Sequence, residues 1–160
     1  MADILLLEIP GIKGNSDLTS HKDQIILLSY SHGVSLPMQH DRANKERTAG
    51  RPVFSEISFS TMSSLATPLI YAACAQGKKL GTAKVHYGRN EDGKFMSVME
   101  IELGDAMISS INTSGGGGIP SDSFSINYTW ITTSFTQQNK DSTNAGKAPF
   151  GWDLALNVAK

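Results

Sequence analysis

The chain has 160 residues, a formal net charge of −1 and a single cysteine. This length is typical of one domain with enough buried surface to fold without a staple, and one cysteine excludes a disulfide within the chain. The near-neutral charge and the lack of long charged runs argue against nucleic acid or an anionic membrane as a partner. We therefore expect one domain over residues 1–160.

The first apolar segment, residues 4–9, indicates a strand and not a targeting peptide. It is short, follows an acidic residue and lacks a basic leading region. Its two alternating faces are both largely apolar, which predicts that the rest of the protein covers both sides of the strand. No segment approaches the roughly 20 apolar residues that span a bilayer, so the sequence alone indicates a cytoplasmic protein.

A second strand is expected over residues 24–32. Simple alternation places Ser29 and Ser31 on the same face as Ile25 and Leu27. That face begins with apolar side chains and ends in two serines. We therefore expect one end of it to be hydrated.

The next segment, residues 35–51, has neither a strand period nor a helix period. It carries four basic and two acidic residues. A loop of this length inside a compact domain is uncommon and is usually either functional or disordered. Two interpretations stay open, a mobile solvated loop and an arm that reaches a neighbouring subunit.

The clearest local signals follow, in the only segment that has both a helix start signal and a helix stop signal. Thr67 is a good N-cap, Pro68 suits the first helical position and Gly77 suits a left-handed C-cap, which predicts a helix at about residues 67–77. The other periodic segments alternate as strands. The expected fold class is therefore mainly β with one short helix, and the glycine-rich residues 112–123 are expected to be a loop.

No combination of residues points to catalysis. The four histidines lack zinc-ligand spacing, no nucleophile elbow is present, and the four consecutive glycines lack the lysine and the helix of a phosphate-binding loop. Each histidine is expected to be a surface or sheet residue with ordinary hydrogen bonds. We predict no enzymatic activity, no catalytic residue, no metal site and no cofactor.

Six short motifs follow one another in a characteristic order. They are the stretch Gly11-Ile12-Lys13-Gly14, His21, the stretch from Ile25 to Gly33, the block at 49–79 with its AG…SF and TP…AC…GK patterns, Ile108-Ser109-Ser110-Ile111, and Gly151-Trp152-Asp153. Together this set resembles the Hcp (haemolysin-coregulated protein) family, the tube protein of bacterial type VI secretion systems. The resemblance runs over most of residues 4–153.

The resemblance implies a fold and a function. The fold would be a small, partly closed β-barrel of two antiparallel sheets, with one short flanking helix at about 67–77 and an extended loop at about 35–51. Six copies would form a ring, and rings would stack into the inner tube, with a sheath outside and a spike at the tip. Small effector proteins would travel in the lumen. Such proteins leave the cytoplasm on firing, without a signal peptide.

The resemblance also assigns residues by position. Ser31 matches the serine of the family's W-S-W-G motif, a cargo-contacting position in the lumen, and Ser29 is a weaker candidate of the same parity. Tyr30 and His32 stand where the motif has tryptophans. The candidate contacts of the arm with other subunits are Gln39, His40, Asp41, Arg42, Lys45, Glu46 and Arg47. Many relatives have glycines there, so contacts in this chain are expected to be more ionic and more sensitive to salt.

One alternative stays open at this point, a monomeric or dimeric β-sandwich that binds carbohydrate or peptide. It would need an exposed aromatic platform, for which Tyr87 or Trp152 would serve. The tube-protein interpretation predicts a ring, so the oligomeric state discriminates between the two.

Overall fold

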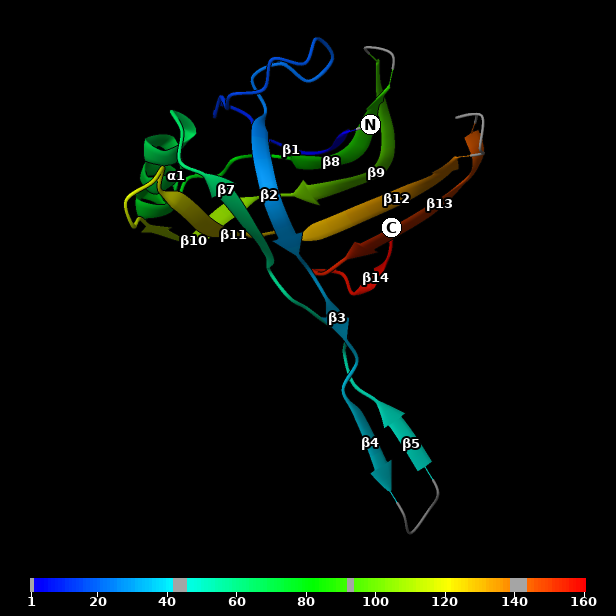
Figure 1. The fold of residues 1–160 in the computed structure, drawn as a ribbon. Coiled ribbons are helices and arrows are strands. Elements are labelled where there is room, and N and C mark those ends of the chain that lie inside the picture. The colour runs from blue at the N-terminus through cyan, green and yellow to red at the C-terminus, as the bar shows by residue number, and fades with distance from the viewer. Residues whose placement is uncertain (1, 42–45, 92–93, 139–143) are drawn as a thin grey trace.

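The computed structural model describes residues 2–41, 46–91, 94–138 and 144–160, and the side chains of all but a few residues next to the gaps and at the outer end of the arm (Figure 1). These residues form fourteen strands and one helix. In chain order the elements are β1 (Ala2–Glu8), β2 (Ile25–Ser31), β3 (Val34–Ser35), β4 (Met38–Asp41), β5 (Glu46–Ala49), β6 (Val53–Phe54), β7 (Ile57–Met62), α1 (Ala66–Gln76), β8 (Ala83–Glu91), β9 (Lys94–Gly104), β10 (Met107–Ser114), β11 (Ser121–Asn127), β12 (Trp130–Gln138), β13 (Asn144–Asp153) and β14 (Val158–Ala159).

Ten strands follow one another in the order β10-β11-β7-β2-β1-β8-β9-β12-β13-β14, and every neighbouring pair is antiparallel. Only two residue pairs join β1 to β2, so the strands divide there into a four-stranded half ending in β2 and a six-stranded half beginning with β1. Core residues come from both halves and form one cluster, with Phe59 and Phe124 from the first and Leu103 and Ile131 from the second. The expected mainly β fold of antiparallel sheets is confirmed.

Strand β1 is covered on both sides, as its two apolar faces predict. Leu6 and Leu7 point to opposite faces, and both are fully buried. Leu7 belongs to the core, whereas Leu6 lies beside residues 15–18 of the loop that follows the strand. That loop folds tightly onto the next strand, because a Cβ at Gly14 would lie only 2.5 Å from the backbone of Gln24.

The single helix among the described residues ends as predicted but begins differently. Gly77 is the left-handed C-cap, with φ 60° and ψ 39°. The N-cap is Leu65, which makes no capping bond through its side chain. The predicted N-cap role of Thr67 is wrong, because its hydroxyl lies inside the first turn and donates its proton to the buried carboxylate of Asp122, at 2.5 Å.

The segment between β2 and β7 leaves the body as a long arm (Figure 1). It is extended, as predicted, but it is a paired ribbon and not an irregular loop. Strands β3 and β6 pair at its root, and β4 and β5 pair further out, from Met38↔Ala49 to Asp41↔Glu46. Alternation was no guide to these strands because they are short and much of the ribbon is open to solvent at its root, where Val34 and Val53 are each 56% exposed.

The glycine-rich loop is shorter than predicted. Strand β10 continues to Ser114 and β11 begins at Ser121, which leaves residues 115–120 as the connection. Both strand ends are polar on each face, so no apolar alternation marked them. No helix in the described part of the chain is both long enough and apolar enough to cross a membrane.

Candidate functional site

The solvent side of the four-stranded half is lined by hydroxyl groups. Because side chains alternate across a strand, the residues between the core side chains point outward, and the register aligns them in rows. We call this surface the serine face; one row is Ser31, Ser58, Ser125 and Ser110, and the next is Ser29, Ser60, Ser123 and Asn112. Most of these residues are exposed.

Two β-bulges set the direction of these side chains. The register shifts between Leu27 and Ser29 in β2, and again between Ile108 and Ser110 in β10. An extra residue reverses the alternation beyond it, so Tyr30 turns toward the core while its neighbouring serines face outward. The prediction that Ser29 and Ser31 share the face of Ile25 and Leu27 is therefore wrong. Their exposure agrees with the expectation of a hydrated end.

One carboxylate belongs to the serine face, and the sequence analysis did not single it out. Glu56 lies between β6 and β7 and accepts a hydrogen bond from Ser109 Oγ at 2.5 Å and one from Asn127 Nδ2 at 3.4 Å. The hydrogen bond from Ser109 lowers the pKa of Glu56, against a smaller opposing effect of burial. The carboxylate is therefore ionised at neutral pH.

The root of the arm is fixed to the body by Tyr128. Its hydroxyl donates to the carbonyl oxygen of Ser55 at 2.8 Å and lies 2.6 Å from His32 Nε2. The phenol has one proton and donates it in the hydrogen bond to the Ser55 carbonyl oxygen. In the contact with Tyr128, the donor must therefore be His32 Nε2. Two further hydrogen bonds cross the ribbon. The backbone N–H of Gly33 donates to the Ser55 hydroxyl at 2.9 Å, and the backbone N–H of Ser55 donates to the Gly33 carbonyl oxygen at 2.9 Å.

His32 stands where the family's motif has a tryptophan, and in addition to being a ring at that position it makes this hydrogen bond to Tyr128. Its ring centroid lies 5.9 Å from that of Tyr128 and 6.4 Å from that of Phe54. Burial lowers the pKa of His32 and raises that of Tyr128 to about 12. Both groups are consequently uncharged at neutral pH, which suits a partly buried hydrogen bond between them.

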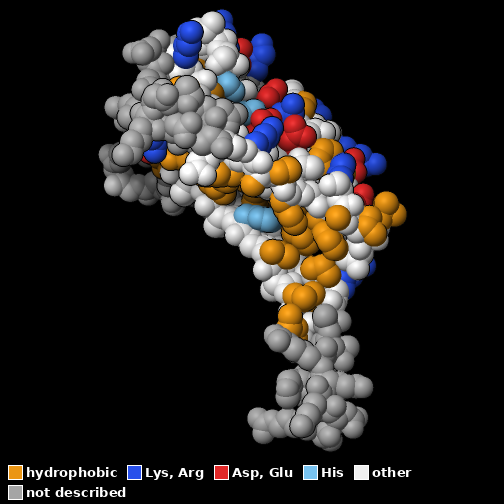
Figure 2. Space-filling model, turned by 90° about the vertical axis from the view of Figure 1, so that its right-hand side faces the viewer, with side chains coloured by type: hydrophobic (Ala, Val, Ile, Leu, Met, Phe, Trp, Pro, Cys, Tyr) orange, Lys and Arg blue, Asp and Glu red, His pale blue; other side chains and the backbone are white. Residues whose placement is uncertain are grey.

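Apolar side chains gather where the arm leaves the body (Figure 2). The ring of Phe54 stacks on Phe150 with 6.5 Å between centroids. We call this surface the apolar foot; it consists of Val34, Leu36, Val53, Phe54 and Phe150. Four of its members are between 43% and 56% exposed. Contiguous apolar surface of this kind marks an interaction site.

The aromatic platform of the alternative function is not formed. Trp152 lies 6.3 Å from Phe54, centroid to centroid and nearly parallel, so Phe54 covers one ring face. Tyr87 is half-buried. Trp152 is partly buried as well, so neither ring is a fully exposed platform for a sugar.

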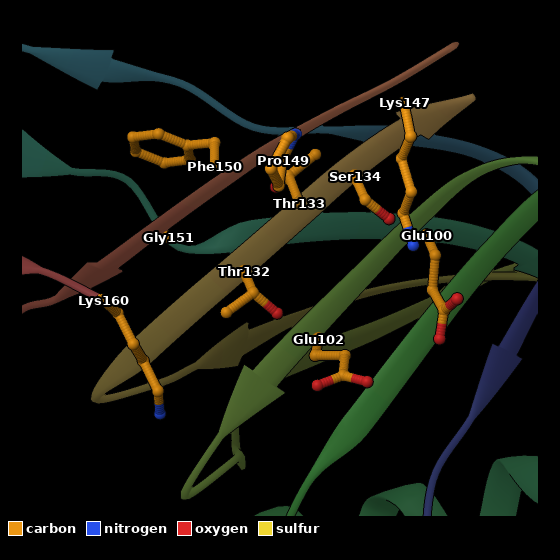
Figure 3. A pocket seen from close by; sticks show the side chains of 10 residues that line it. All are labelled: Glu100, Glu102, Thr132, Thr133, Ser134, Lys147, Pro149, Phe150, Gly151 and Lys160. Atoms are coloured by element: carbon orange, nitrogen blue, oxygen red, sulfur yellow. The ribbon is translucent and has the colours of Figure 1, made fainter. Parts of the chain in front are cut away.

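A shallow hollow of about 340 Å³ lies on the outer side of the six-stranded half (Figure 3). Glu100 and Glu102 of β9 line it together with Lys147 and Lys160, and Lys160 Nζ lies 3.3 Å from the ring centroid of Trp130. The hollow therefore has two acidic and two basic side chains, whose charges cancel. Within the described ranges, no group of three histidine, cysteine or acidic side chains is arranged to hold a metal ion.

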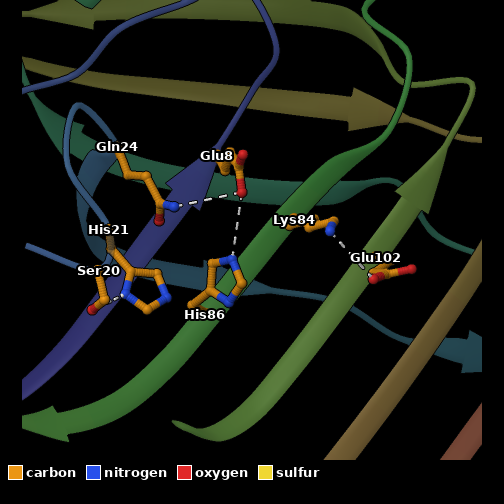
Figure 4. Close-up of polar contacts among 7 residues, drawn as sticks. All are labelled: Glu8, Ser20, His21, Gln24, Lys84, His86 and Glu102. Carbon is orange, nitrogen blue, oxygen red and sulfur yellow. Dashed lines mark hydrogen bonds and ion pairs between the residues drawn. The ribbon is translucent and has the colours of Figure 1, made fainter. Parts of the chain in front are cut away.

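A polar cluster joins the loop of residues 10–24 to the same half (Figure 4). The rings of His21 and His86 meet edge to face with 4.7 Å between centroids. His86 Nε2 lies 3.7 Å from Glu8 Oε2, and Gln24 Nε2 donates to the same oxygen at 3.5 Å. These contacts hold the loop against β1 and β8.

His21 of this cluster and His32 at the root of the arm together predict a loss of stability in mild acid. Burial and the neighbouring His86 lower the pKa of His21, although Glu8 and Glu100 oppose them, and burial lowers that of His32. A lowered folded-state pKa means that the unfolded chain binds protons first as the pH falls. The stability that the neutral histidines contribute is therefore fully present above pH 6.5, the ordinary histidine pKa, and is lost as the pH falls below it.

Urea unfolding at fixed protein concentration, at pH 7.5 and at pH 5.5, measures this effect. We expect a smaller free energy of unfolding at the lower pH, and a smaller difference between the two pH values in His21→Gln. An equal pH dependence in wild type and His21→Gln would show that His21 does not carry the effect.

Comparison with known proteins identifies the fold and the family. The family model described as "Type VI secretion system effector, Hcp" matches residues 6–135. The chain belongs to the Hcp family. It is therefore a type VI secretion system protein, and the matched region includes the serine face, the arm and the helix. Members of this family are secreted proteins of that system.

Individual proteins are similar to this chain in sequence or fold over nearly their whole length. Protein hcp1 of Pseudomonas aeruginosa is 25% identical over 161 aligned positions, which cover 99% of each chain. The solved structure of a type six secretion system protein matches with a TM-score of 0.90 at 20% identity, over 99% of this chain and 100% of the other. Hcp1 from Salmonella typhimurium matches with a TM-score of 0.82 at 18% identity, over 100% of both.

The predicted site residues occupy two separate places on the Hcp fold of this chain. Ser29 and Ser31 lie on the serine face, at the body end of the arm. Gln39, His40 and Asp41 belong to β4, and Glu46 and Arg47 to β5, where only the backbone is described. Arg42 and Lys45 lie outside the described residues.

Proposed function

We propose that this chain is the tube subunit of a type VI secretion system, folded as one domain over residues 1–160. Six copies would close into a ring, and rings would stack into the inner tube. The observation that carries the proposal beyond family membership is the apolar foot, because its aromatic and aliphatic side chains lie uncovered in the single chain. A neighbouring copy would cover them in a ring.

The serine face is the surface that we assign to the lumen. Its exposed hydroxyl groups hold water and form hydrogen bonds with many partners, which suits a channel that carries different effector proteins. Ser31 and Ser29 stand at the edge of this face, paired with Ser58 and Ser60. This placement supports a cargo-contacting role for Ser31, with Ser29 beside it.

The arm is the second contact between subunits. Its residues from Gln39 to Arg47 would meet an adjacent protomer or the next ring, through charged groups that make the contact sensitive to salt. The further partners are the sheath, the spike and small effector proteins. The protein would stay in the cytoplasm until firing and then leave the cell.

The position of Ser31 leads to a direct test. Replacing Ser31 by phenylalanine should abolish retention of effector proteins, because the bulky ring covers the row of hydroxyls, while ring formation is unchanged. The measurement is co-purification of a co-expressed effector with tagged rings, together with the mass of the rings. Ser123→Ala is the control on the same face. Loss of the rings in Ser31→Phe would instead place Ser31 at a subunit interface.

The β-sandwich binding module is not favoured. The two rings that it would use are covered or half-buried, and the family match accounts for the fold without it. A chain that stays monomeric at high concentration would restore it.

A further inference from the structure

The serine face has one charged group within the described part of the chain. Strands β2, β7, β10 and β11 contain no lysine, arginine or glutamate. Their one aspartate, Asp122, is 1% exposed and points to the core side with Phe124. Glu56 is exposed and bonds to Ser109 and Asn127, both outward-facing, so its carboxylate supplies the charge of this surface.

A chain of hydroxyl groups holds this carboxylate in place. Ser109 Oγ lies 2.8 Å from Ser125 Oγ, which lies 2.7 Å from Ser110 Oγ. Each hydroxyl has one proton, and Ser109 donates its proton to Glu56 at 2.5 Å in preference to the backbone carbonyl oxygen of Ser125, which lies 3.2 Å away. Ser125 must therefore donate to Ser109, and Ser110 to Ser125, so that all three protons point toward the carboxylate.

This arrangement fixes the carboxylate without neutralising it. No basic side chain contacts Glu56 among the hydrogen bonds and ion pairs of the described residues. One oxygen, Oε1, accepts a long hydrogen bond from Asn127 at 3.4 Å, and the side chain is exposed, so the carboxylate is open to a donor from solution. The result is an oriented negative charge on a face whose four strands otherwise present uncharged side chains to solvent.

We propose that Glu56 is the charged contact of the serine face and selects protein cargo that presents lysine or arginine. Charge complementarity is the argument, because a cation meets an attractive group and no repulsive one on this surface. The inference rests on the proposed tube function, in which a ring would place six copies of Glu56 around one channel. Acidic cargo would meet a repulsive charge there.

Two labelled peptides test the contact directly. Both have twelve residues, one alternating lysine with glycine and serine, the other with glutamate in place of each lysine. Their binding to the purified protein is measured by fluorescence anisotropy at about 50 mM salt, where the Debye length exceeds 10 Å. Wild type should bind the lysine peptide more tightly than the glutamate peptide.

The variants separate a local contact from overall charge. Glu56→Gln keeps the shape of the side chain and should weaken binding of the lysine peptide about three- to fivefold, as expected for an exposed ion pair. Glu100→Gln makes the same change in charge on the other half of the protein and should leave the affinity unchanged. Ser109→Ala, which releases the carboxylate, should cause a smaller loss than Glu56→Gln. About 0.5 M salt should remove these differences.

The outcomes distinguish this inference from the proposed function. Rings that bind the lysine peptide equally in wild type and Glu56→Gln would overturn the role of Glu56 and leave the tube function standing. Equal losses in Glu56→Gln and Glu100→Gln would overturn it too, since overall charge would then be the cause. A monomeric protein with the predicted loss only in Glu56→Gln would support the contact and overturn the ring.

Discussion

Replacement of Asp122 by alanine is expected to lower the free energy of unfolding by about 3 kcal/mol, which corresponds to a fall in melting temperature of about 6–12 °C. The carboxylate accepts hydrogen bonds from Ser63 at 2.9 Å, Thr113 at 2.7 Å and Thr67 at 2.5 Å. Tyr71 Oη donates in turn to Thr113, at 2.7 Å. Removing the acceptor leaves three hydroxyl donors without their partner where the helix meets the sheet.

Urea unfolding of Asp122→Ala at fixed protein concentration measures this loss. Ser123→Ala is the matched control, because the next residue of the same strand points to solvent and should change stability by less than about 0.5 kcal/mol. If Asp122→Ala were as stable as Ser123→Ala, this network would not be what fixes α1 to the sheet.

The second large effect concerns assembly. The double substitution Val34→Glu and Val53→Glu should convert the ring to a monomer. Both side chains are 56% exposed in the single chain, so charge costs little there. In the assembly each glutamate would be buried against a neighbour without a partner, at a cost of several kcal/mol per contact.

The readout is the solution mass at a series of concentrations, with melting temperature as a check on folding. Thr19→Glu adds a negative charge on the exposed loop that follows β1, away from the foot, and should leave the mass unchanged. A six-fold mass in the double variant would show that the apolar foot is not an interface. A fall in mass in Thr19→Glu as well would point to net charge as the cause.

Local signals in the sequence predicted the parts of the fold that depend on neighbouring residues. Gly77 ends the helix as predicted, because a left-handed C-cap depends only on the glycine at that position. The start of the helix was misassigned because Thr67 bonds to Asp122, which lies 55 residues further along the chain. No pattern around Thr67 carries that information.

The candidate site shows the same limit. Alternation gave the wrong partners for Ser29 and Ser31, because the bulge at Leu28 is set by pairing with β7 and leaves no mark in the sequence of β2. Glu56 was missed because a single glutamate between two strands has no motif. The available signal was indirect, namely the lack of any lysine or arginine in four strands that share a face.

The solution mass of the purified chain shows whether it assembles into rings. Light scattering on the purified protein, with negative-stain imaging of the same peak, should give six times 17.2 kDa, about 103 kDa, and six-fold rings. A protein that keeps the mass of one chain at high concentration would contradict assembly into rings.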